Sequence, residues 1–204
     1  MCGIAGVLLP VACATETGSV AAEVRAMLAT MLHRGPDADG LWADPARRCV
    51  LGHRRLSIID TSDAGRQPLA STDGRWVITF NGEIYNYREL TPAVAAAGMA
   101  PRGRTDTEVL ANAIALWGTD ALEKLDGQYA FAAFDTLTGR LILARDPFGE
   151  KPLYYLRSPS GSLAFASELQ ALERLPWFDG EVSADSVAES SASAVTERAG
   201  CLEL

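Results

Sequence analysis

The sequence has few of the residues that build metal sites and disulfide frameworks. Its four cysteines, at positions 2, 13, 49 and 201, include no Cys-x-x-Cys pair. Its only two histidines, His33 and His53, follow no zinc spacing. We therefore expect neither a metal centre nor structural disulfides, and this cysteine usage favours a reducing cytoplasm.

Positive charge and long apolar runs are also scarce. The chain has 18 Lys and Arg residues but 26 Asp and Glu residues. The resulting formal net charge of −8 repels a phosphate backbone. No run approaches the ~20 apolar residues of a membrane span. The apolar stretch 3–14 lacks the preceding positive charge of a signal peptide, because the first basic residue is Arg25. We expect no nucleic-acid partner and no membrane attachment.

The chain is long enough for one domain with a tail. It has 204 residues, of which 48% are hydrophobic, and this supports one sizeable core. From Asp179 onward the composition shifts to Ser, Ala and Glu without Phe, Tyr or Trp. We expect a domain over residues 2–178 and a weakly ordered Ser/Ala-rich tail over residues 179–204.

Strand and helix patterns are segregated along the chain. Alternating apolar runs bounded by turn residues predict strands over 76–80, 129–134, 141–144, 152–156 and 162–166. Helical spacing predicts helices over 20–32, 87–97 and 105–117, the last two ended by Gly98 and Gly118. Because no regular βαβ alternation appears, the pattern favours an α+β fold with mainly antiparallel sheets.

Cys2 follows the initiator Met1 and precedes Gly3. Removal of Met1 would leave a cysteine whose α-amine, with a pKa near ~7.7–8.0, could take the proton of its own thiol. Cys2 on its own could equally be a small buried hydrophobic residue, the commoner fate of a lone cysteine.

Ordered motifs extend this N-terminal signal over residues 2–175. They are Met1-Cys2-Gly3-Ile4-Ala5-Gly6, His33-Arg34-Gly35-Pro36-Asp37, His53-Arg54-Arg55-Leu56-Ser57-Ile58-Ile59-Asp60, Asn81-Gly82-Glu83-Ile84-Tyr85-Asn86, Arg104-Thr105-Asp106-Thr107-Glu108, Leu125-Asp126-Gly127-Gln128-Tyr129-Ala130-Phe131, Ala144-Arg145-Asp146-Pro147-Phe148-Gly149 and Lys151-Pro152-Leu153-Tyr154-Tyr155. In this order they resemble class II glutamine amidotransferases, and specifically the glutaminase domain of glutamine-hydrolysing asparagine synthetase. The resemblance implies the four-layer α/β/β/α sandwich of N-terminal-nucleophile hydrolases.

The resemblance assigns three residues to catalysis. Cys2 matches the nucleophile, while the Asn81 side-chain amide and the Gly82 N–H match the donors that stabilise an oxyanion. Glycine suits a backbone donor that must approach a substrate without a Cβ in the way. The same Asn-Gly pair also favours a β-turn after a strand that ends at Phe80.

The resemblance also assigns residues to the two charged ends of glutamine. Arg55 matches the group that binds the carboxylate, and Asp106 matches the group that binds the ammonium. Glu83 matches a neighbouring polar contact. Ile58 and Ile59 match positions that line the pocket through their backbone carbonyls. Each of these charged side chains alone would more often be a solvated surface group.

We expect other polar residues of the motifs to support the fold and not to contact the substrate. We interpret Arg34 and Asp37 as parts of a turn in which Pro36 sets φ, and Asp146 as structural as well. His53 receives no role, because the α-amine of Cys2 makes a separate base unnecessary.

The synthetase half of the resembling enzymes is missing from the sequence. It contains neither a Ser-Gly-Gly phosphate-binding segment followed by Asp nor a Gly-x-x-x-x-Gly-Lys-Ser/Thr loop. We therefore expect no cofactor in this chain, since ATP and Mg would belong to that absent domain. A separate synthetase or amidotransferase partner, or self-association, should cover an exposed apolar patch near residues 146–155 and 165–172.

Glutamine hydrolysis to glutamate and ammonia is the function that these residues favour. The chain would supply ammonia to an asparagine-synthetase-like system in the cytoplasm. Two alternatives remain: a non-catalytic or regulatory relic that binds a partner, and a related hydrolase that acts on another amide. The joint presence of Cys2, Arg55, Asn81, Gly82 and Asp106 favours the enzyme over the relic.

Overall fold

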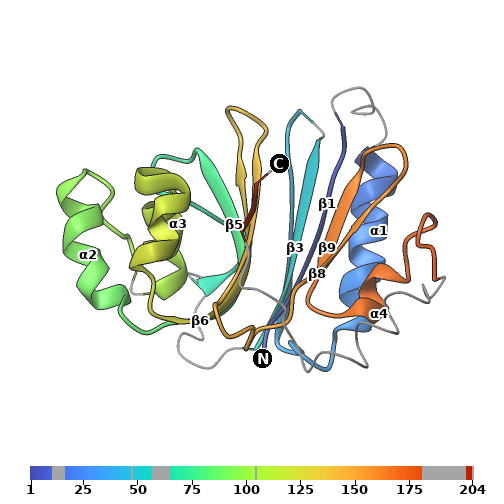
Figure 1. Ribbon diagram of the computed structural model, residues 1–204, viewed down its shortest axis with the longest axis horizontal. Helices are drawn as coiled ribbons and strands as arrows, with labels where there is room; N and C mark the ends of the chain where they lie inside the picture. Colours follow the sequence, from blue (N-terminus) through green and yellow to red (C-terminus); the bar gives the residue numbers. More distant parts are fainter. Residues whose placement is uncertain (11–16, 47, 57–64, 104, 181–200, 204) are drawn as a thin grey trace, which may run out of the picture.

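The computed structural model describes residues 1–10, 17–46, 48–56, 65–103, 105–180 and 201–203, which form four layers. In Figure 1 two five-stranded sheets stand face to face. Helix α3 (Asp106–Trp117) covers one outer face and α2 (Tyr87–Ala96) packs on α3 from outside, whereas α1 (Thr17–Thr30) and α4 (Leu169–Leu172) cover the other face. The predicted α/β/β/α sandwich is confirmed.

The first sheet holds the start of the chain at its centre. In spatial order its strands are β2 (Ala38–Ala43), β3 (Cys49–Arg55), β1 (Gly3–Leu8), β9 (Leu163–Ala166) and β8 (Tyr154–Arg157). Every neighbouring pair is antiparallel. All six residues of β1 are buried, because α1 packs on one side of the sheet and the second sheet lies on the other.

The second sheet ends in a strand of only two residues. In spatial order its strands are β10 (Cys201–Glu203), β7 (Leu141–Arg145), β6 (Gly127–Asp135), β5 (Trp76–Ile84) and β4 (Leu69–Ala70). β5 pairs with β6 over its whole length, but β4 pairs only with Val77 and Ile78. Among the described residues, no strand therefore covers the outer edge of β5 beyond Ile78.

Alternation along β6 explains why this strand is apolar on both faces. Tyr129 and Phe131 pack in the cluster shared with α3, whereas Ala130 and Phe134 pack in the cluster between the sheets. Successive side chains of a strand point to opposite faces, so a strand between two layers needs apolar residues at every position.

The predicted strands and helices lie close to the observed ones. The predicted strands 129–134 and 141–144 pair antiparallel as β6 and β7, and the predicted strands 152–156 and 162–166 pair antiparallel as β8 and β9. Helix α3 begins after Thr105, whose hydroxyl accepts a hydrogen bond from the Glu108 N–H at 3.3 Å, and ends at Gly118 with φ 59°. The predicted turn at Asn81-Gly82 is wrong, because β5 continues through both residues in register with β6.

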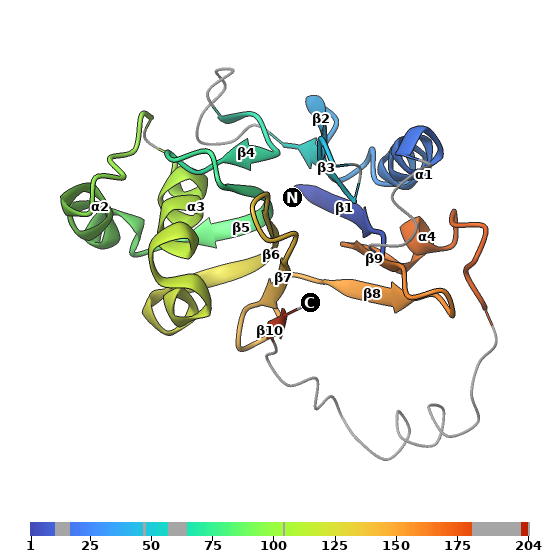
Figure 2. The same ribbon diagram turned by 90° about the horizontal axis from the view of Figure 1, so that it is seen from above.

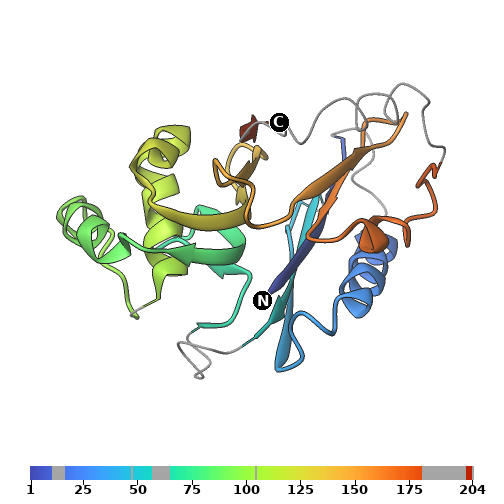
Figure 3. The ribbon, with the colours of Figure 1, turned by 60° about the horizontal axis from the view of Figure 1, so that its bottom comes forward.

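The tail predicted over residues 179–204 lies mostly outside the described residues. Of it the structure describes residues 179, 180 and 201–203, the last three as β10 beside β7. The other end of the chain leads into β1 at the centre of the first sheet. Figure 1 shows the N-terminus at one end of the sandwich, and Figures 2 and 3 show that it lies between the two sheets.

Candidate active site

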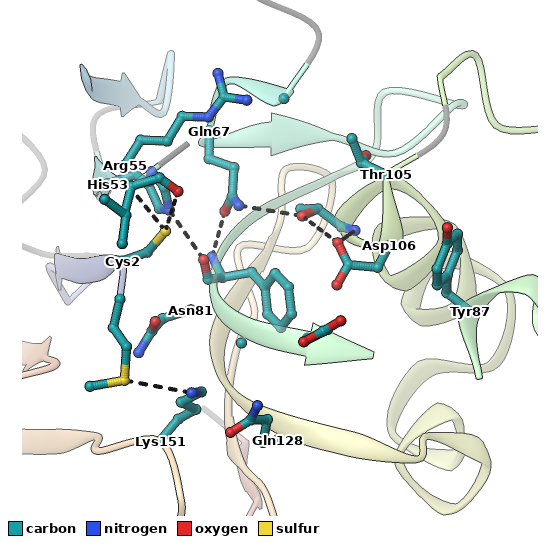
Figure 4. A pocket seen from close by; sticks show the side chains of 17 residues that line it. Cys2, His53, Arg55, Gln67, Asn81, Tyr87, Thr105, Asp106, Gln128 and Lys151 are labelled. Atoms are coloured by element: carbon teal, nitrogen blue, oxygen red, sulfur yellow. Dashed lines mark hydrogen bonds between the residues drawn. The ribbon is translucent and has the colours of Figure 1, made fainter. Parts of the chain in front are cut away.

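A pocket of about 350 Å³ opens where β1 begins and where β3 and β5 end, near the start of α3. Seventeen residues line it, among them most of the residues predicted from the sequence: Cys2, Arg55, Asn81, Gly82, Glu83 and Asp106. Figure 4 shows that they come from both sheets and from α3. The predicted pocket residues Ile58 and Ile59 lie outside the described residues.

Cys2 immediately precedes β1 and borders the pocket. Its Sγ accepts a hydrogen bond from the Leu56 N–H at 3.5 Å and lies 3.9 Å from the Leu56 carbonyl oxygen. Two hydrogen bonds with Ser167 secure the beginning of β1, one from the Ile4 N–H to the Ser167 Oγ and one from the Ser167 N–H to the Ile4 oxygen. The thiol is therefore carried by a rigid strand.

Arg34 holds the backbone of Cys2. Its Nε donates to the Cys2 carbonyl oxygen at 2.9 Å, and its Nη1 pairs with Glu168 at 3.1 Å. The guanidinium is buried and its Nη2 has no hydrogen-bond partner among the described residues. The interpretation of Arg34 as a turn residue missed this contact, since no sequence spacing relates Arg34 to Glu168, which follows it by 134 positions.

Asn81 lies in β5 and faces the pocket (Figure 4). It is only 2% exposed, and its side-chain Nδ2 has no hydrogen-bond partner in the described part of the chain. A buried donor without an acceptor costs roughly 1–3 kcal/mol. Such a group in a pocket is well suited to an acceptor that arrives with a substrate.

The Gly82 N–H points to the edge of β5 that β4 leaves uncovered. Backbone N–H groups two residues apart in a strand point to the same edge. On this edge the Phe80 N–H donates to Gln67 Oε1 at 2.7 Å, and the Ile84 N–H donates to Asp106 Oδ2 at 3.0 Å. Gly82 lies between them, so its N–H is aimed into the pocket beside Asn81.

The structure gives a further reason for glycine at position 82. A Cβ there would collide with the carbonyl oxygen of Gln128 and would lie 2.7 Å from the Cα of Tyr129. Both atoms belong to β6, which pairs with β5 at this point. Glycine is therefore required here by the neighbouring strand, and its role in the approach of a substrate stays a prediction.

Charged side chains of opposite sign lie on different walls of the pocket. Arg55 ends β3 and is buried, while Asp106 is the first residue of α3 (Figure 4). Burial raises the pKa of the Asp106 carboxyl, and the nearby Glu83 carboxylate adds to this shift. Asp106 also accepts a hydrogen bond from the Thr107 N–H at 2.8 Å. Glu83 itself is exposed at the rim.

Three further residues at the pocket escaped prediction from the sequence. His53 is buried, and its Nε2 lies 3.2 Å from the Phe80 carbonyl oxygen. Burial lowers the pKa of His53 to about 4, and the Arg55 charge adds to this effect. Gln67 contacts Phe80, and the Nζ of Lys151 lies 3.6 Å from the Met1 Sδ. These contacts link residues that the sequence places far apart.

Asp146 has the structural role that was expected. It is buried and accepts hydrogen bonds from four backbone N–H groups, those of Tyr129, Phe148, Glu150 and Lys151. It therefore shapes the loop that carries Lys151. In the described ranges no three His, Cys, Asp or Glu side chains are arranged to hold a metal ion, and no helix there is long and apolar enough to cross a membrane.

Comparison with known proteins gives consistent results. Residues 1–202 match the family described as "Glutamine amidotransferase domain". Asparagine synthetase [glutamine-hydrolyzing] 1 of Bacillus subtilis is 41% identical over 174 residues, covering 84% of this chain and 26% of its own length. Asparagine synthetase [glutamine-hydrolyzing] 3 of Arabidopsis thaliana is 37% identical over 172 residues, covering 84% of this chain and 28% of its own length.

The fold is shared with a solved amidotransferase. The glutamine phosphoribosylpyrophosphate amidotransferase of B. subtilis superposes with a TM-score of 0.65 at 21% identity, covering 84% of this chain and 43% of that chain. This chain thus spans less than a third of the asparagine synthetases that it matches. Its sequence, its sandwich and its pocket agree: the chain belongs to the family of class II glutamine amidotransferase domains.

Proposed function

We propose that this domain hydrolyses the side-chain amide of glutamine to glutamate and ammonia, with Cys2 as the nucleophile. The observation that carries this proposal is the buried Asn81 Nδ2, a donor without a partner among the described residues, in the same pocket as the Cys2 thiol. A donor held near a thiol without an acceptor of its own suits the oxyanion of acyl transfer.

The chemistry needs only protein groups and water. After removal of Met1, the Cys2 α-amine takes the thiol proton and the thiolate attacks the amide carbon. The negative oxygen of the tetrahedral intermediate accepts hydrogen bonds from Asn81 Nδ2 and the Gly82 N–H. The protonated amine then gives its proton to the leaving nitrogen, and ammonia departs. The α-amine next deprotonates a water molecule, which attacks the thioester and releases glutamate with the thiol restored.

The two ends of glutamine match the charges on the walls. We propose that Arg55 pairs with the substrate carboxylate and that Asp106, supported by Glu83, pairs with the ammonium. Ile58 and Ile59 would add backbone carbonyls. Because Asp106 already accepts backbone hydrogen bonds, its orientation is set before the substrate arrives.

We propose a synthetase of the asparagine-forming class as the ammonia acceptor, because the named relatives are glutamine-hydrolysing asparagine synthetases and this chain covers only 26% and 28% of their lengths. ATP and Mg would bind to that synthetase, and this chain would need no cofactor. A free thiol nucleophile also suits the reducing cytoplasm.

The surface for this partner includes exposed aromatic side chains in the segment 146–155. Phe148 is 88% exposed and Tyr155 is 58% exposed. The other segment predicted to be exposed is mostly buried: Phe165 and Leu172 lie in the core, whereas Leu169 is exposed. The apolar surface is thus narrower than the sequence predicted, and self-association is the alternative use for it.

The test is glutamate release from glutamine by the purified domain, with the N-terminal residue identified by intact mass. Glutamate and ammonia should form in equal amounts, and Cys2→Ala should abolish both. Cys49→Ala is the matched control, because Cys49 is fully buried in β3 and is not part of the pocket lining. A correctly processed parent that releases no glutamate would favour the binding relic, and faster cleavage of another amide would favour the related hydrolase.

A further inference from the structure

We propose that Gln67 and His53 are positioning residues for the oxyanion donors, which they hold by clamping the Phe80 peptide groups next to Asn81. This inference rests on the proposed glutaminase function and extends it to two side chains outside the predicted site. Both residues line the pocket, and both contact the backbone of Phe80 (Figure 4).

The uncovered edge of β5 creates the need for the clamp. In the register of β4 and β5, Leu69 lies opposite Ile78. Continuing this register places position 67 opposite Phe80, but the paired residues of β4 begin only at Leu69. A strand edge without a neighbour leaves N–H and C=O groups unpaired. At Phe80 two side chains replace the missing strand.

Gln67 supplies the acceptor. Its Oε1 accepts the Phe80 N–H at 2.7 Å, the bond that a neighbouring strand would otherwise make. At its other end, Nε2 lies 3.4 Å from the Thr107 hydroxyl, and the Thr107 N–H in turn donates to Asp106. The Gln67 side chain therefore joins β5, which carries Asn81 and Gly82, to the start of α3, where the substrate ammonium would bind.

His53 supplies the donor from the other sheet. It lies in β3 opposite Ile4 of β1, the strand that follows Cys2. A carbonyl oxygen can only accept, so the Nε2 at 3.2 Å from the Phe80 oxygen must carry the proton. Because the pKa of His53 is lowered to about 4, this is a neutral imidazole at pH 7. This hydrogen bond joins the sheet that follows Cys2 to β5, the strand that carries Asn81 and Gly82.

The clamp matters because nucleophile and oxyanion donors belong to different sheets. The distance between Cys2 and Asn81 depends on how the two sheets pack, and catalysis tolerates misplacement of a donor poorly. Thr79 makes a comparable bond between the sheets, from its Oγ1 to the Gly52 oxygen at 3.0 Å, but it does not line the pocket. A variant of Thr79 therefore tests the effect of weaker packing between the sheets, without a change in the contacts of Phe80.

The experiment compares nearly isosteric pairs of variants. His53→Met and Gln67→Met remove the polar ends, whereas His53→Gln keeps a donor at the position of Nε2 and Gln67→Glu keeps the acceptor for Phe80. Steady-state glutamine hydrolysis is measured per reactive Cys2 thiol, counted by alkylation, so that misfolded protein does not enter the rate. Thr79→Val is the control.

We expect each Met variant to lower kcat about 10- to 100-fold with KM changed less than about threefold, since a misplaced oxyanion donor weakens the transition state more than the ground state. His53→Gln and Gln67→Glu should each recover most of the loss. Thr79→Val should lower the melting temperature but keep kcat. Met variants with the kcat of the parent, or a Thr79→Val variant as slow as they are, would overturn the proposal.

Amide hydrogen exchange gives a readout that does not depend on activity. Exchange at the Phe80 N–H should be faster in Gln67→Met than in Thr79→Val, and an equal rate would overturn the clamp. If the parent itself hydrolyses no glutamine, the proposed function fails, while the exchange comparison still decides whether Gln67 holds Phe80.

Discussion

The Nε of Arg34 donates a hydrogen bond to the carbonyl oxygen of Cys2 at 2.9 Å, across 32 positions of sequence. The Arg34 guanidinium thus holds the peptide group that joins Cys2 to Gly3, next to the thiol. Arg34 is itself held by Glu168. The residue proposed as the nucleophile is therefore held by a largely buried ion pair.

Arg34→Ala should lower kcat about 10- to 100-fold, because a hydrogen bond to a charged group contributes about 1.5–3 kcal/mol. Arg54→Ala is the matched control, since the Nε of Arg54 donates to the Leu28 oxygen at 3.1 Å, away from the pocket lining. Initial rates at saturating glutamine measure the effect. Equal losses in the two variants would show that Arg34 acts through stability alone.

Asn81→Ala should lower kcat by about 10²–10³-fold with little change in KM, because it removes one oxyanion donor. The variant should not lose stability, since the Asn81 Nδ2 has no partner in the described residues to lose. Kinetics and thermal melts on the same preparation measure both quantities. A large loss of stability with unchanged kcat would contradict the assigned role.

Arg55→Ala should weaken glutamine binding by about 2–5 kcal/mol, because a substrate carboxylate would enter the pocket without its partner. Calorimetry in a Cys2→Ala background separates this effect from turnover. Cys2→Ala alone should bind glutamine measurably while turning none over. Parent-like affinity in Arg55→Ala would mean that Arg55 is structural.

Retention of Met1 should abolish activity. A nitrogen in a peptide bond cannot act as a base, and Met1 lines the pocket with its Sδ 3.6 Å from Lys151 Nζ. Protein carrying an uncleavable N-terminal tag should be inactive, whereas release of a cleavable tag up to Cys2 should restore turnover. Full activity in protein whose intact mass includes Met1 would exclude the α-amine as the base.

Stability should fall in mild acid because of His53. Its pKa is lowered from 6.5 to about 4 by burial, so between these values the unfolded chain binds a proton that the folded chain does not. The contribution is present above pH 6.5 and is lost as pH falls toward 4, a change of up to about 3 kcal/mol in the free energy of unfolding. Urea unfolding at several pH values measures this dependence. Between pH 6.5 and 4 the free energy of unfolding should fall less steeply in His53→Gln than in the parent, and equal slopes in the two proteins would contradict the lowered pKa of His53.

The sequence by itself determined the class of the fold and most of the pocket. Alternating apolar residues, as in β6, and the caps of α3 are local signals, so their elements were predictable. Cys2, Asn81 and Asp106 stood in recognisable motifs, and the structure brings them to one pocket. The prediction of a turn at Asn81-Gly82 was wrong, because the pairing of β5 with β6 outweighs the local preference of Asn-Gly for a turn.

Only the tertiary structure decided which side chains support the site. The bonds of Arg34 to Cys2, of His53 to the Phe80 oxygen and of Gln67 to the Phe80 N–H all join residues distant in sequence. The two bonds at Phe80 lie beyond the end of β4, and the one from His53 joins the sheet that begins after Cys2 to the sheet that contains Asn81. No periodicity or spacing encodes where a strand lacks a neighbour, because that depends on how separate segments pack.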